Sequence, residues 1–360
     1  MSKLITLGIL GGGQLGRMSA MAAARLGISV VIFCPDENSP ASYVCKENII
    51  ANYDDKAALK KFSDKTDFIS YEFENIPIET IDYLNSLKQD SVLPDKSLLN
   101  VSQDRIKEKT FLNDHGIKTT RWSSTSDIND IKNTLKSWGG NEFILKTTRF
   151  GYDGKGQIKC DIKDTDELNK FLNDTDGQGI IMEELVDFAC EISIIVARDI
   201  EGNSETYGPM LNEHKNHILH KTTVPSNISE ATESKALGIA KDIAETINLI
   251  GVLTVEFFVC KDGGVLVNEI APRTHNSGHW SIDACCVSQF ENHVRTVCGL
   301  PVGSTARHSN ATMLNIIGDD VNNIDDLLGA DNGCLYLYGK RQARTGRKMG
   351  HITFIKPKGD

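Results

Sequence analysis

The hydrophobic pattern of the first hundred residues alternates between short apolar runs and amphipathic stretches. Short apolar runs predict buried strands, and apolar residues that recur every three or four positions predict helices. The predicted strands are residues 4–10, 29–33 and 68–71, and the predicted helices are residues 14–26, 56–62 and 78–87. This alternation is typical of a doubly wound α/β domain with a parallel sheet.

The pattern changes toward the middle of the chain, where strand signals follow one another closely. A helix through Arg105 and Lys109 follows a boundary-like stretch at residues 93–97. Further predicted strands cover 143–146, 157–159, 179–183, 192–197 and a hairpin at 252–270, with helices at 165–172 and 231–246. These signals indicate an α+β region with mainly antiparallel strands, followed by a short β-rich tail. We therefore expect a multidomain α/β and α+β protein, divided at 1–100, 101–300 and 301–360.

The composition excludes several classes of protein. A formal net charge of −10 disfavours a nucleic-acid binder. No apolar run approaches the ~18 residues of a membrane span, and the first residues lack a signal-peptide pattern. Nine cysteines without a C-x-x-C pair argue against a disulfide framework and a zinc site. We expect a cytoplasmic protein with reduced thiols and no membrane partner.

One basic segment near the end of the chain departs from this acidic balance. It holds five cations without a carboxylate and precedes His351. The cations are Lys340, Arg341, Arg344, Arg347 and Lys348. Most charge runs are solvated loops, and that alternative stays open here. A compact cationic patch in an acidic protein nevertheless favours a site for an anionic small molecule.

Two glutamates flank the turn of the predicted hairpin. If Asp262-Gly263 is a two-residue turn, Glu256 lies opposite Glu269 on the same face; if Gly263-Gly264 is the turn, the glutamates are diagonal neighbours. Directly opposed residues have Cβ atoms roughly 4.5–5.5 Å apart, so two buried carboxylates there need a cation or a shared proton. Mg²⁺ bridging to nucleotide phosphates suits such hard oxygen ligands. The alternative is a solvent-facing pair on an edge hairpin.

Two glycine-rich turns follow predicted strands. The first, Gly11-Gly12-Gly13-Gln14-Leu15-Gly16, matches the G-x-G-x-x-G dinucleotide fingerprint, with Asp36 after the next strand. Doubly wound domains that bind no NAD use the same turn, so we expect a polar or anionic ligand there and no dinucleotide. The second turn, residues 149–157, contains Gly151, Gly154 and Gly156, and could fold over phosphates beside Lys146 and Lys155. An ordinary glycine turn between strands is the alternative.

A third segment has the pattern of an adenine-binding linker. The apolar run 180–182 ends in Glu183-Glu184-Leu185-Val186, and Glu191 follows. Backbone groups at the end of such a strand can meet an adenine edge, and a carboxylate a few residues later can hold ribose hydroxyls. These glutamates could equally be exposed, so the pattern is weak by itself.

Taken in order, these motifs resemble the ATP-grasp superfamily and, within it, the 5-(carboxyamino)imidazole ribonucleotide synthases of purine biosynthesis. The resemblance runs essentially from end to end. The motifs that carry it are Gly12-Gly13-Gln14-Leu15-Gly16-Arg17-Met18, Phe150-Gly151-Tyr152-Asp153-Gly154-Lys155-Gly156-Gln157, Asn268 to Trp280, Tyr338-Gly339-Lys340, and Gly346 to His351. It implies a Rossmann-like pre-ATP-grasp domain, a central ATP-grasp domain and a small β-rich C-terminal domain.

The resemblance also implies roles for individual positions. ATP would be surrounded by Arg105, Lys146, Tyr152, Asp153, Gly154, Lys155, Gly156, Gln157, Ile158, Glu183, Glu184, Leu185, Val186, Glu191, His214, Asn268 and Glu269. Mg²⁺ would be held by Glu256 and Glu269. Bicarbonate and the ribonucleotide would meet Gln14, Leu15, Glu72, Asp153, Arg273, His275, Asn276, Lys340, Arg347 and Lys348. The reacting groups would meet Tyr152, Lys155, Arg273 and Lys340. Many ATP-grasp enzymes carry a metal-binding Asn two positions after the second glutamate, where this chain has Ala271, so the role of Asn268 stays open.

The implied reaction is the ATP-dependent carboxylation of aminoimidazole ribonucleotide with bicarbonate through carboxyphosphate, with the second glycine turn as a lid. No nucleophilic side chain is required, and none stands out in the sequence. The alternatives are another ATP-grasp ligase such as a formate-dependent ribonucleotide transformylase, an inactive nucleotide-binding protein, and a Rossmann oxidoreductase. The intact Glu256 and Glu269 pair speaks against the inactive protein. The resemblance further suggests a homodimer.

Overall fold

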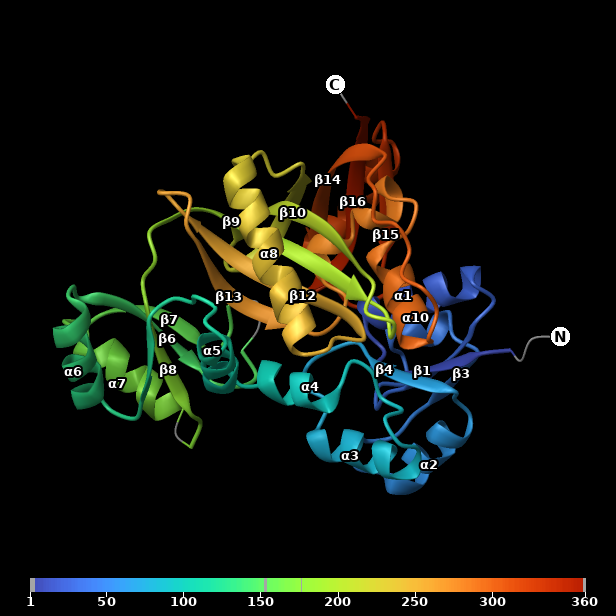
Figure 1. Cartoon of the computed structure of the whole chain (residues 1–360), viewed down its shortest axis with the longest axis horizontal. Coiled ribbons are helices and arrows are strands. Elements are labelled where there is room, and N and C mark those ends of the chain that lie inside the picture. The colour runs from blue at the N-terminus through green and yellow to red at the C-terminus, as the bar shows by residue number, and fades with distance from the viewer. Residues whose placement is uncertain (1–3, 152–153, 176, 359–360) are drawn as a thin grey trace.

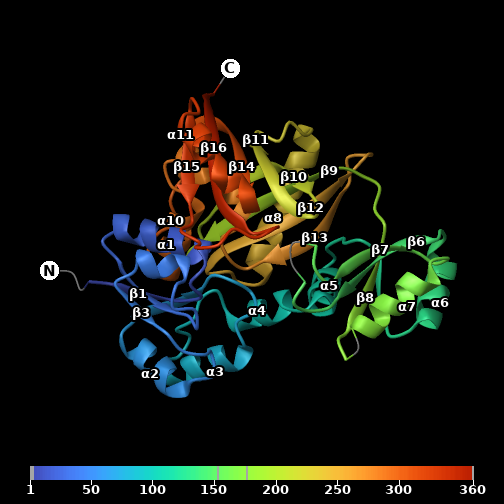
Figure 2. The ribbon, with the colours of Figure 1, turned by 180° about the vertical axis from the view of Figure 1, so that it is seen from behind.

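The computed structural model describes residues 4–151, 154–175 and 177–358, which form three parts around one cleft. The N-terminal domain and a small lobe lie at opposite ends of the long axis, and a large antiparallel sheet lies between and above them (Figure 1). The view from behind places the C-terminal strands above the N-terminal domain and away from the small lobe (Figure 2). In the described ranges no helix is long and apolar enough to cross a membrane.

The N-terminal domain is built on a parallel sheet with the strand order β3-β2-β1-β4. Its elements are β1 (Thr6–Leu10), α1 (Gln14–Arg25), β2 (Ser29–Phe33), a 3-10 turn (Pro40–Tyr43), β3 (Glu47–Ile49), α2 (Lys56–Asp64), β4 (Phe68–Tyr71) and α3 (Ile78–Leu87). The predicted doubly wound domain is confirmed. The sequence did not predict β3, which is too short to show a pattern. Because β2 and β4 lie on opposite sides of β1, the ends of β1 and β4 form the switch point at which such sheets bind ligands.

The small lobe follows two connecting helices, α4 (Lys96–Ser102) and α5 (Arg105–Asp114). Its elements are β5 (Trp122–Thr125), α6 (Ile128–Trp138), β6 (Glu142–Thr147), β7 (Gln157–Asp161), α7 (Thr165–Asp174) and β8 (Ile180–Glu184). The strands pair antiparallel in the order β5-β8-β6-β7. Leu135 of α6 and Leu168 of α7 share a core with Leu145 and Met182. Because side chains alternate along a strand, the opposite face of this sheet carries Lys146 and Glu183.

The large sheet has eight strands in the order β13-β12-β9-β10-β11-β14-β16-β15. Its strands are β9 (Phe188–Arg198), β10 (Ser204–Lys215), β11 (Ile218–Val224), β12 (Gly251–Cys260), β13 (Val265–Ala271), β14 (Ser309–Ile317), β15 (Gly333–Leu337) and β16 (Lys348–Pro357). Its helices are α8 (Glu230–Thr246), α9 (Ser281–Ala284), α10 (Gln289–Val297) and α11 (Ile324–Leu328), with 3-10 turns at Asn276–Gly278 and Gly318–Asn323. The β-rich tail expected from residue 301 continues this sheet, because β14 pairs with β11.

Helices from two parts of the chain enclose the N-terminal sheet. Met18 of α1 and Phe290 of α10 pack in one core with Leu7 and Ile32. Residues of α2 and α3 pack in a second core on the other side of the strands. Because α10 belongs in sequence to the central region, the N-terminal domain is fixed to the large sheet by a shared hydrophobic core.

The hairpin turn between β12 and β13 differs from both predicted forms. The N–H of Cys260 donates to the carbonyl of Gly264 at 2.8 Å, and the N–H of Gly263 donates to the carbonyl of Cys260 at 2.9 Å. The loop therefore has three residues, Lys261-Asp262-Gly263, with Gly263 at a φ of +80°. Glycine adopts this left-handed conformation without steric cost, which favours the three-residue loop. Both predicted two-residue turns are wrong.

Candidate active site

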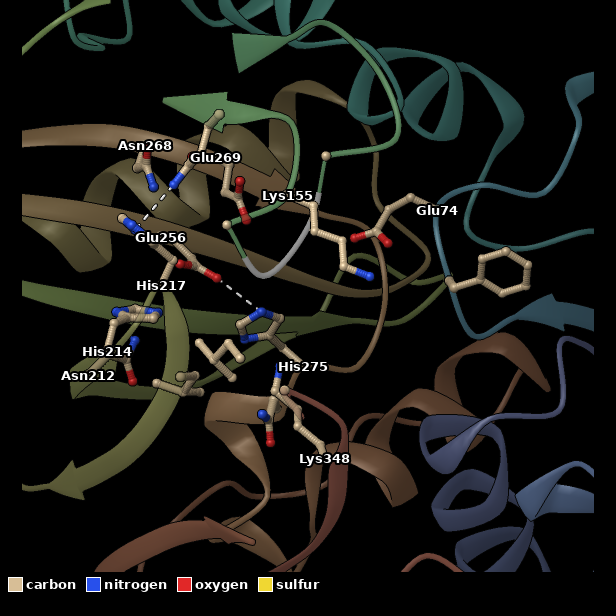
Figure 3. A pocket seen from close by; sticks show the side chains of 18 of the residues that line it. Glu74, Lys155, Asn212, His214, His217, Glu256, Asn268, Glu269, His275 and Lys348 are labelled. Atoms are coloured by element: carbon tan, nitrogen blue, oxygen red, sulfur yellow. Dashed lines mark hydrogen bonds and ion pairs between the residues drawn. The ribbon is translucent and has the colours of Figure 1, made fainter. Parts of the chain in front are cut away.

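A cleft of about 1680 Å³ lies where the three parts meet (Figure 3). Most of the residues predicted from the sequence line it. They are Gln14, Leu15, Glu72, Arg105, Gly154, Lys155, Gln157, Glu191, His214, Glu256, Asn268, Glu269, Arg273, His275, Asn276, Lys340, Arg347 and Lys348. The cleft thus brings together residues more than 300 positions apart in the chain.

Other predicted residues lie outside the lining of the cleft. These are Lys146, Gly156, Ile158, Glu183, Glu184, Leu185 and Val186. Tyr152 and Asp153 fall outside the described residues. Lys146 and Glu183 are both buried, and Nζ of Lys146 lies 2.7 Å from Oε2 of Glu183. Burial alone would raise the pKa of Glu183, but the ammonium groups of Lys146 and Lys109 outweigh it and hold the pKa at about 2.

Glu256 and Glu269 lie directly opposite each other on β12 and β13, which is one of the two arrangements that the sequence left open. The pairing arises differently from the prediction. The three-residue turn shifts the register by one position, and a bulge between the Glu256 and Phe257 positions shifts it back. Val267 and Ile270 both enter the same core, which strict alternation would forbid. The extra residue of the bulge therefore lets both Asn268 and Glu269 face the cleft.

Each glutamate of the pair contacts a basic side chain. Oε2 of Glu269 lies 3.3 Å from Nη1 of Arg105, and Oε1 of Glu256 lies 3.0 Å from Nε2 of His275 (Figure 3). Burial acts to raise the pKa of Glu269, but the charges of Arg105 and Lys146 lower it below the usual range. Glu269 is therefore held in an environment that favours its negative charge.

The residues at the bulge fit a hard divalent cation. The side-chain oxygen Oδ1 of Asn268 is buried and has no hydrogen-bond partner among the described residues. Together with the opposed carboxylates of Glu256 and Glu269 it gives an all-oxygen donor set, which suits Mg²⁺. In the described part of the chain no three His, Cys, Asp or Glu residues form a complete metal cage. A cation here would need further oxygen ligands, which nucleotide phosphates provide.

The first glycine turn already holds a carboxylate of the protein itself. Glu72, just after β4, accepts hydrogen bonds from the backbone N–H of Gly13 and, at 2.8 Å, from that of Gly16. Burial raises the pKa of Glu72, although these two N–H donors oppose the shift. A Cβ at Gly13 would lie 2.6 Å from Oε1 of Glu72. The glycine is thus required for the approach of Glu72, which occupies the anion site at the start of α1.

The basic segment forms the opposite wall of the cleft. Arg344, Arg347 and Lys348 line it with Lys340, and Nζ of Lys340 donates to the carbonyl of Lys348 at 2.6 Å. Nη1 of Arg347 donates to the carbonyl of Gln342 at 3.0 Å. His351, by contrast, is fully buried and lies 2.8 Å from the hydroxyl of Tyr338. The segment is thus built to present cations to the cavity.

Several site residues have neighbours that the sequence did not indicate. Glu74 forms an ion pair with Arg273, and His214 pairs through Nδ1 with Oε2 of Glu191 at 2.6 Å. Glu108 and His217 also line the cleft. Burial and the nearby carboxylate of Glu269 raise the pKa of Glu108 to about 8. Glu108 is three positions after Arg105 on one helix face, which is the only sequence signal that could have found it.

Comparison with known proteins agrees with this geometry. Three family models match the chain: the ribonucleotide synthetase preATP-grasp domain over residues 4–103, the ATP-grasp domain over residues 110–290, and the phosphoribosylaminoimidazole carboxylase C-terminal domain over residues 311–360. The N5-carboxyaminoimidazole ribonucleotide synthase of Brucella melitensis is 46% identical over 98% of this chain and 97% of its own length. The synthase of Bacillus subtilis is 40% identical over 97% of this chain and 91% of its own.

Solved structures give the same answer. The ADP complex of the N5-carboxyaminoimidazole synthetase from Staphylococcus aureus has a TM-score of 0.91 at 36% identity, covering 99% of this chain and 94% of that one. The Aspergillus clavatus synthase in complex with ADP and aminoimidazole ribonucleotide has a TM-score of 0.90 at 26% identity, covering 99% and 95%. The chain belongs to the N5-carboxyaminoimidazole ribonucleotide synthase family of ATP-grasp enzymes.

Proposed function

We propose that this enzyme carboxylates 5-amino-1-(5-phospho-D-ribosyl)imidazole with ATP and bicarbonate in de novo purine biosynthesis. The products are 5-carboxyamino-1-(5-phospho-D-ribosyl)imidazole, ADP and phosphate. The observation that carries this proposal is the single cleft, in which the Glu256 and Glu269 pair shares a cavity with the basic segment and the Glu72 turn. An acidic wall and a cationic wall in one cavity suit a reaction between a metal-bound nucleotide and a second phosphorylated substrate.

On the nucleotide side, the chain binds ATP and orients its terminal phosphate toward bicarbonate. Glu256, Glu269 and Asn268 would hold Mg²⁺, which when bound neutralises the charge of the transferring phosphoryl group. Arg105 and Lys155 add positive charge from the lining of the cleft. Lys146 would reach the phosphates from the end of β6, while the linker 183–186 would meet the adenine and Glu191 the ribose.

On the ribonucleotide side, the chain holds the second substrate against the activated carbon. Arg273, His275 and Asn276 would bind bicarbonate, and both amide atoms of Asn276 are buried without a partner among the described residues. Bicarbonate attacks the terminal phosphate of ATP, and ADP leaves. The exocyclic amine of the ribonucleotide then captures the carbon of carboxyphosphate, either directly or as CO₂, and phosphate leaves. Glu72, Gln14 and Leu15 would meet the imidazole, and Lys340, Arg347 and Lys348 its 5′-phosphate.

ADP release tests this proposal directly. We expect ADP release to require bicarbonate and to rise with aminoimidazole ribonucleotide, with ¹³C from labelled bicarbonate appearing in the carboxylated product. ADP release that depends on formate would instead identify a transformylase. Failure of bicarbonate and ribonucleotide to stimulate ADP release would refute the proposed function.

We also propose that the enzyme works as a homodimer in the cytoplasm, as the family resemblance implies. Analytical ultracentrifugation of the purified protein at micromolar concentration tests the assembly. A sedimentation coefficient that matches the 39.6 kDa chain alone would contradict the dimer.

A further inference from the structure

Helix α5 covers the outer side of β13 beyond Val267, whose own N–H donates to the carbonyl of Lys118 at 2.9 Å. β13 is the edge strand of the large sheet, and both ribbon views place α5 between that sheet and the small lobe (Figures 1 and 2). The carbonyl of Asn268 accepts a hydrogen bond from Nζ of Lys109 at 2.9 Å. The N–H of Ile270 donates to Oε1 of Glu108 at 2.6 Å. Two side chains of α5 thus satisfy the backbone groups on either side of Glu269.

The same face of α5 also contacts the carboxylate of Glu269. Arg105, Glu108 and Lys109 are related by spacings of three and four residues, which place them on one side of a helix. Arg105 contacts the side chain of Glu269 at 3.3 Å. One turn of α5 therefore contacts three consecutive residues of β13, which are the residues of the bulge and its immediate neighbour.

The burial of Glu108 and Lys109 indicates that the contacts are specific. Lys109 is 0% exposed and Glu108 is 3% exposed, and burying a polar or charged group is costly unless it is hydrogen-bonded. Nζ of Lys109 also lies 3.8 Å from Oε1 of Glu183, and Glu183 holds Lys146 at 2.7 Å. Lys109 thus links the bulge of β13 to the lysine at the end of β6 in the small lobe.

We propose that Glu108 and Lys109 are positioning residues, which hold the bulge of β13 so that Asn268 and Glu269 both face the metal-bound nucleotide. This inference rests on the proposed function, which assigns these two residues to Mg²⁺. A one-residue change of register reverses the faces of a strand, so loss of the bulge would move one of the two donors away from the cleft. The hydrogen bonds at Asn268 and Ile270 oppose that change.

Binding of Mn²⁺ with ADP tests the positioning role without catalysis. The first variant is Lys109→Met, which nearly keeps the length of the side chain but removes the ammonium group that donates to Asn268. The second is Glu108→Leu, which removes the oxygen that accepts from Ile270. The concentration of free Mn²⁺, followed by electron paramagnetic resonance, gives the dissociation constant. We expect it to rise by about 10- to 100-fold in both variants, as is typical when a group that orients a metal ligand is lost. Binding of ADP without metal should be unchanged.

Matched variants separate positioning from general damage. Lys107→Met changes an exposed lysine on the same helix and should bind Mn²⁺ with ADP as the wild type does. Glu108→Gln retains an oxygen that accepts from Ile270 and should restore binding, whereas Glu108→Asp withdraws the oxygen by one methylene and should weaken it. Glu108→Asp is the mildest change and decides the matter if larger changes prevent folding.

The inference is overturned if folded Lys109→Met, Glu108→Leu or Glu108→Asp protein binds Mn²⁺ with ADP as the wild type does. It is also overturned if Glu108→Gln is as defective as Glu108→Leu. These readouts do not involve bicarbonate or the ribonucleotide. If the wild type bound Mn²⁺ with ADP but showed no bicarbonate-dependent ADP release, the proposed function would fail while the positioning role stood.

Discussion

Glu269 is the residue on which most of the proposed chemistry depends, because it belongs to the carboxylate pair and also contacts Arg105. Glu269→Gln keeps the shape of the side chain but removes the charge that Mg²⁺ requires. We expect ATP turnover to fall by about a hundredfold or more, as when one electrostatic contact to a developing charge is removed. The fold should survive because the amide oxygen can still accept from Arg105. Steady-state ADP release and the circular dichroism spectrum measure the two effects.

Glu167→Gln provides the control for that experiment. Glu167 is an exposed carboxylate on α7, so its loss should leave turnover unchanged. Near-normal turnover in Glu269→Gln protein would contradict the metal assignment.

Arg347 belongs to the cationic wall, and its removal should affect one substrate only. A well-placed ionised donor to phosphate contributes roughly 1.5–3 kcal/mol, so Arg347→Ala should raise the KM for aminoimidazole ribonucleotide about ten- to hundredfold. The KM for ATP should barely move. Arg341→Ala is the matched control, because Arg341 is exposed and lies outside the lining of the cleft. A shift in the KM for ATP alone would mean that the two substrate sites are reversed.

The sequence indicated Glu256, Glu269 and Arg347 as site residues because each lies in a local motif. The opposition of Glu256 and Glu269 followed from the hairpin, although the turn and the bulge each differ from the expected register. Glu108 and Lys109 were not predicted as site residues. Their partners Ile270 and Asn268 lie about 160 positions away, and no local pattern encodes such a contact.

At the scale of elements, the first glycine turn matches the sequence pattern of a dinucleotide site but leaves no space for a pyrophosphate. Glu72 accepts from the N–H groups at the start of α1 that would otherwise meet a pyrophosphate. We therefore expect no saturable change in protein fluorescence on titration with NAD⁺. A titration with ADP and Mg²⁺ serves as the positive control. Micromolar binding of NAD⁺ would contradict the assignment of this turn to the ribonucleotide side.

The elements that the sequence predicted are those with strong periodicity or a glycine turn. The hairpin of β10 and β11 was not predicted. Its two-residue turn is Asn216-His217, and both residues have positive φ, at 51° and 63°. Glycine usually marks such a turn, so a histidine there gives no signal. His217 adopts this strained φ at the lining of the cleft, beside Gly154 and Gln157.

At the scale of the whole molecule, the domain boundaries expected from the sequence separate segments that share a sheet or a hydrophobic core in the structure. The C-terminal strands extend the large sheet through β11 and β14, and α10 covers the N-terminal sheet. Long-range pairings of this kind leave no trace in local composition. They explain how a basic segment near the end of the chain shares a cleft with a turn near its beginning.

Buried histidines lie at the junctions between these parts and make their union sensitive to acid. His293 of α10 lies 2.9 Å from the hydroxyl of Ser70 in β4, and the ring centroids of His279 and His351 are 4.6 Å apart. Burial lowers the pKa of His293 to about 4 and that of His351 to about 3. The unfolded chain binds protons at these histidines below about pH 6.5, whereas the folded chain does not.

Stability should therefore fall as the pH decreases from about 6.5 toward 4, by about 1.4 kcal/mol per pH unit for each such histidine. Glu108 acts in the opposite direction, because its raised pKa of about 8 lets the folded state hold an extra proton, so the comparison of variants is more informative than the total slope.

His293→Gln keeps a hydrogen-bonding group for Ser70 but cannot titrate. Urea unfolding between pH 7 and 5 should show that the free energy of unfolding of His293→Gln protein depends less steeply on pH than that of the wild type. The difference in slope should correspond to nearly one bound proton. His115→Gln changes an exposed histidine at the C-terminal end of α5 and should leave the slope unchanged. Equal slopes in all three proteins would mean that the His293 junction opens or hydrates before it titrates, and that the parts are not held together by a dry contact there.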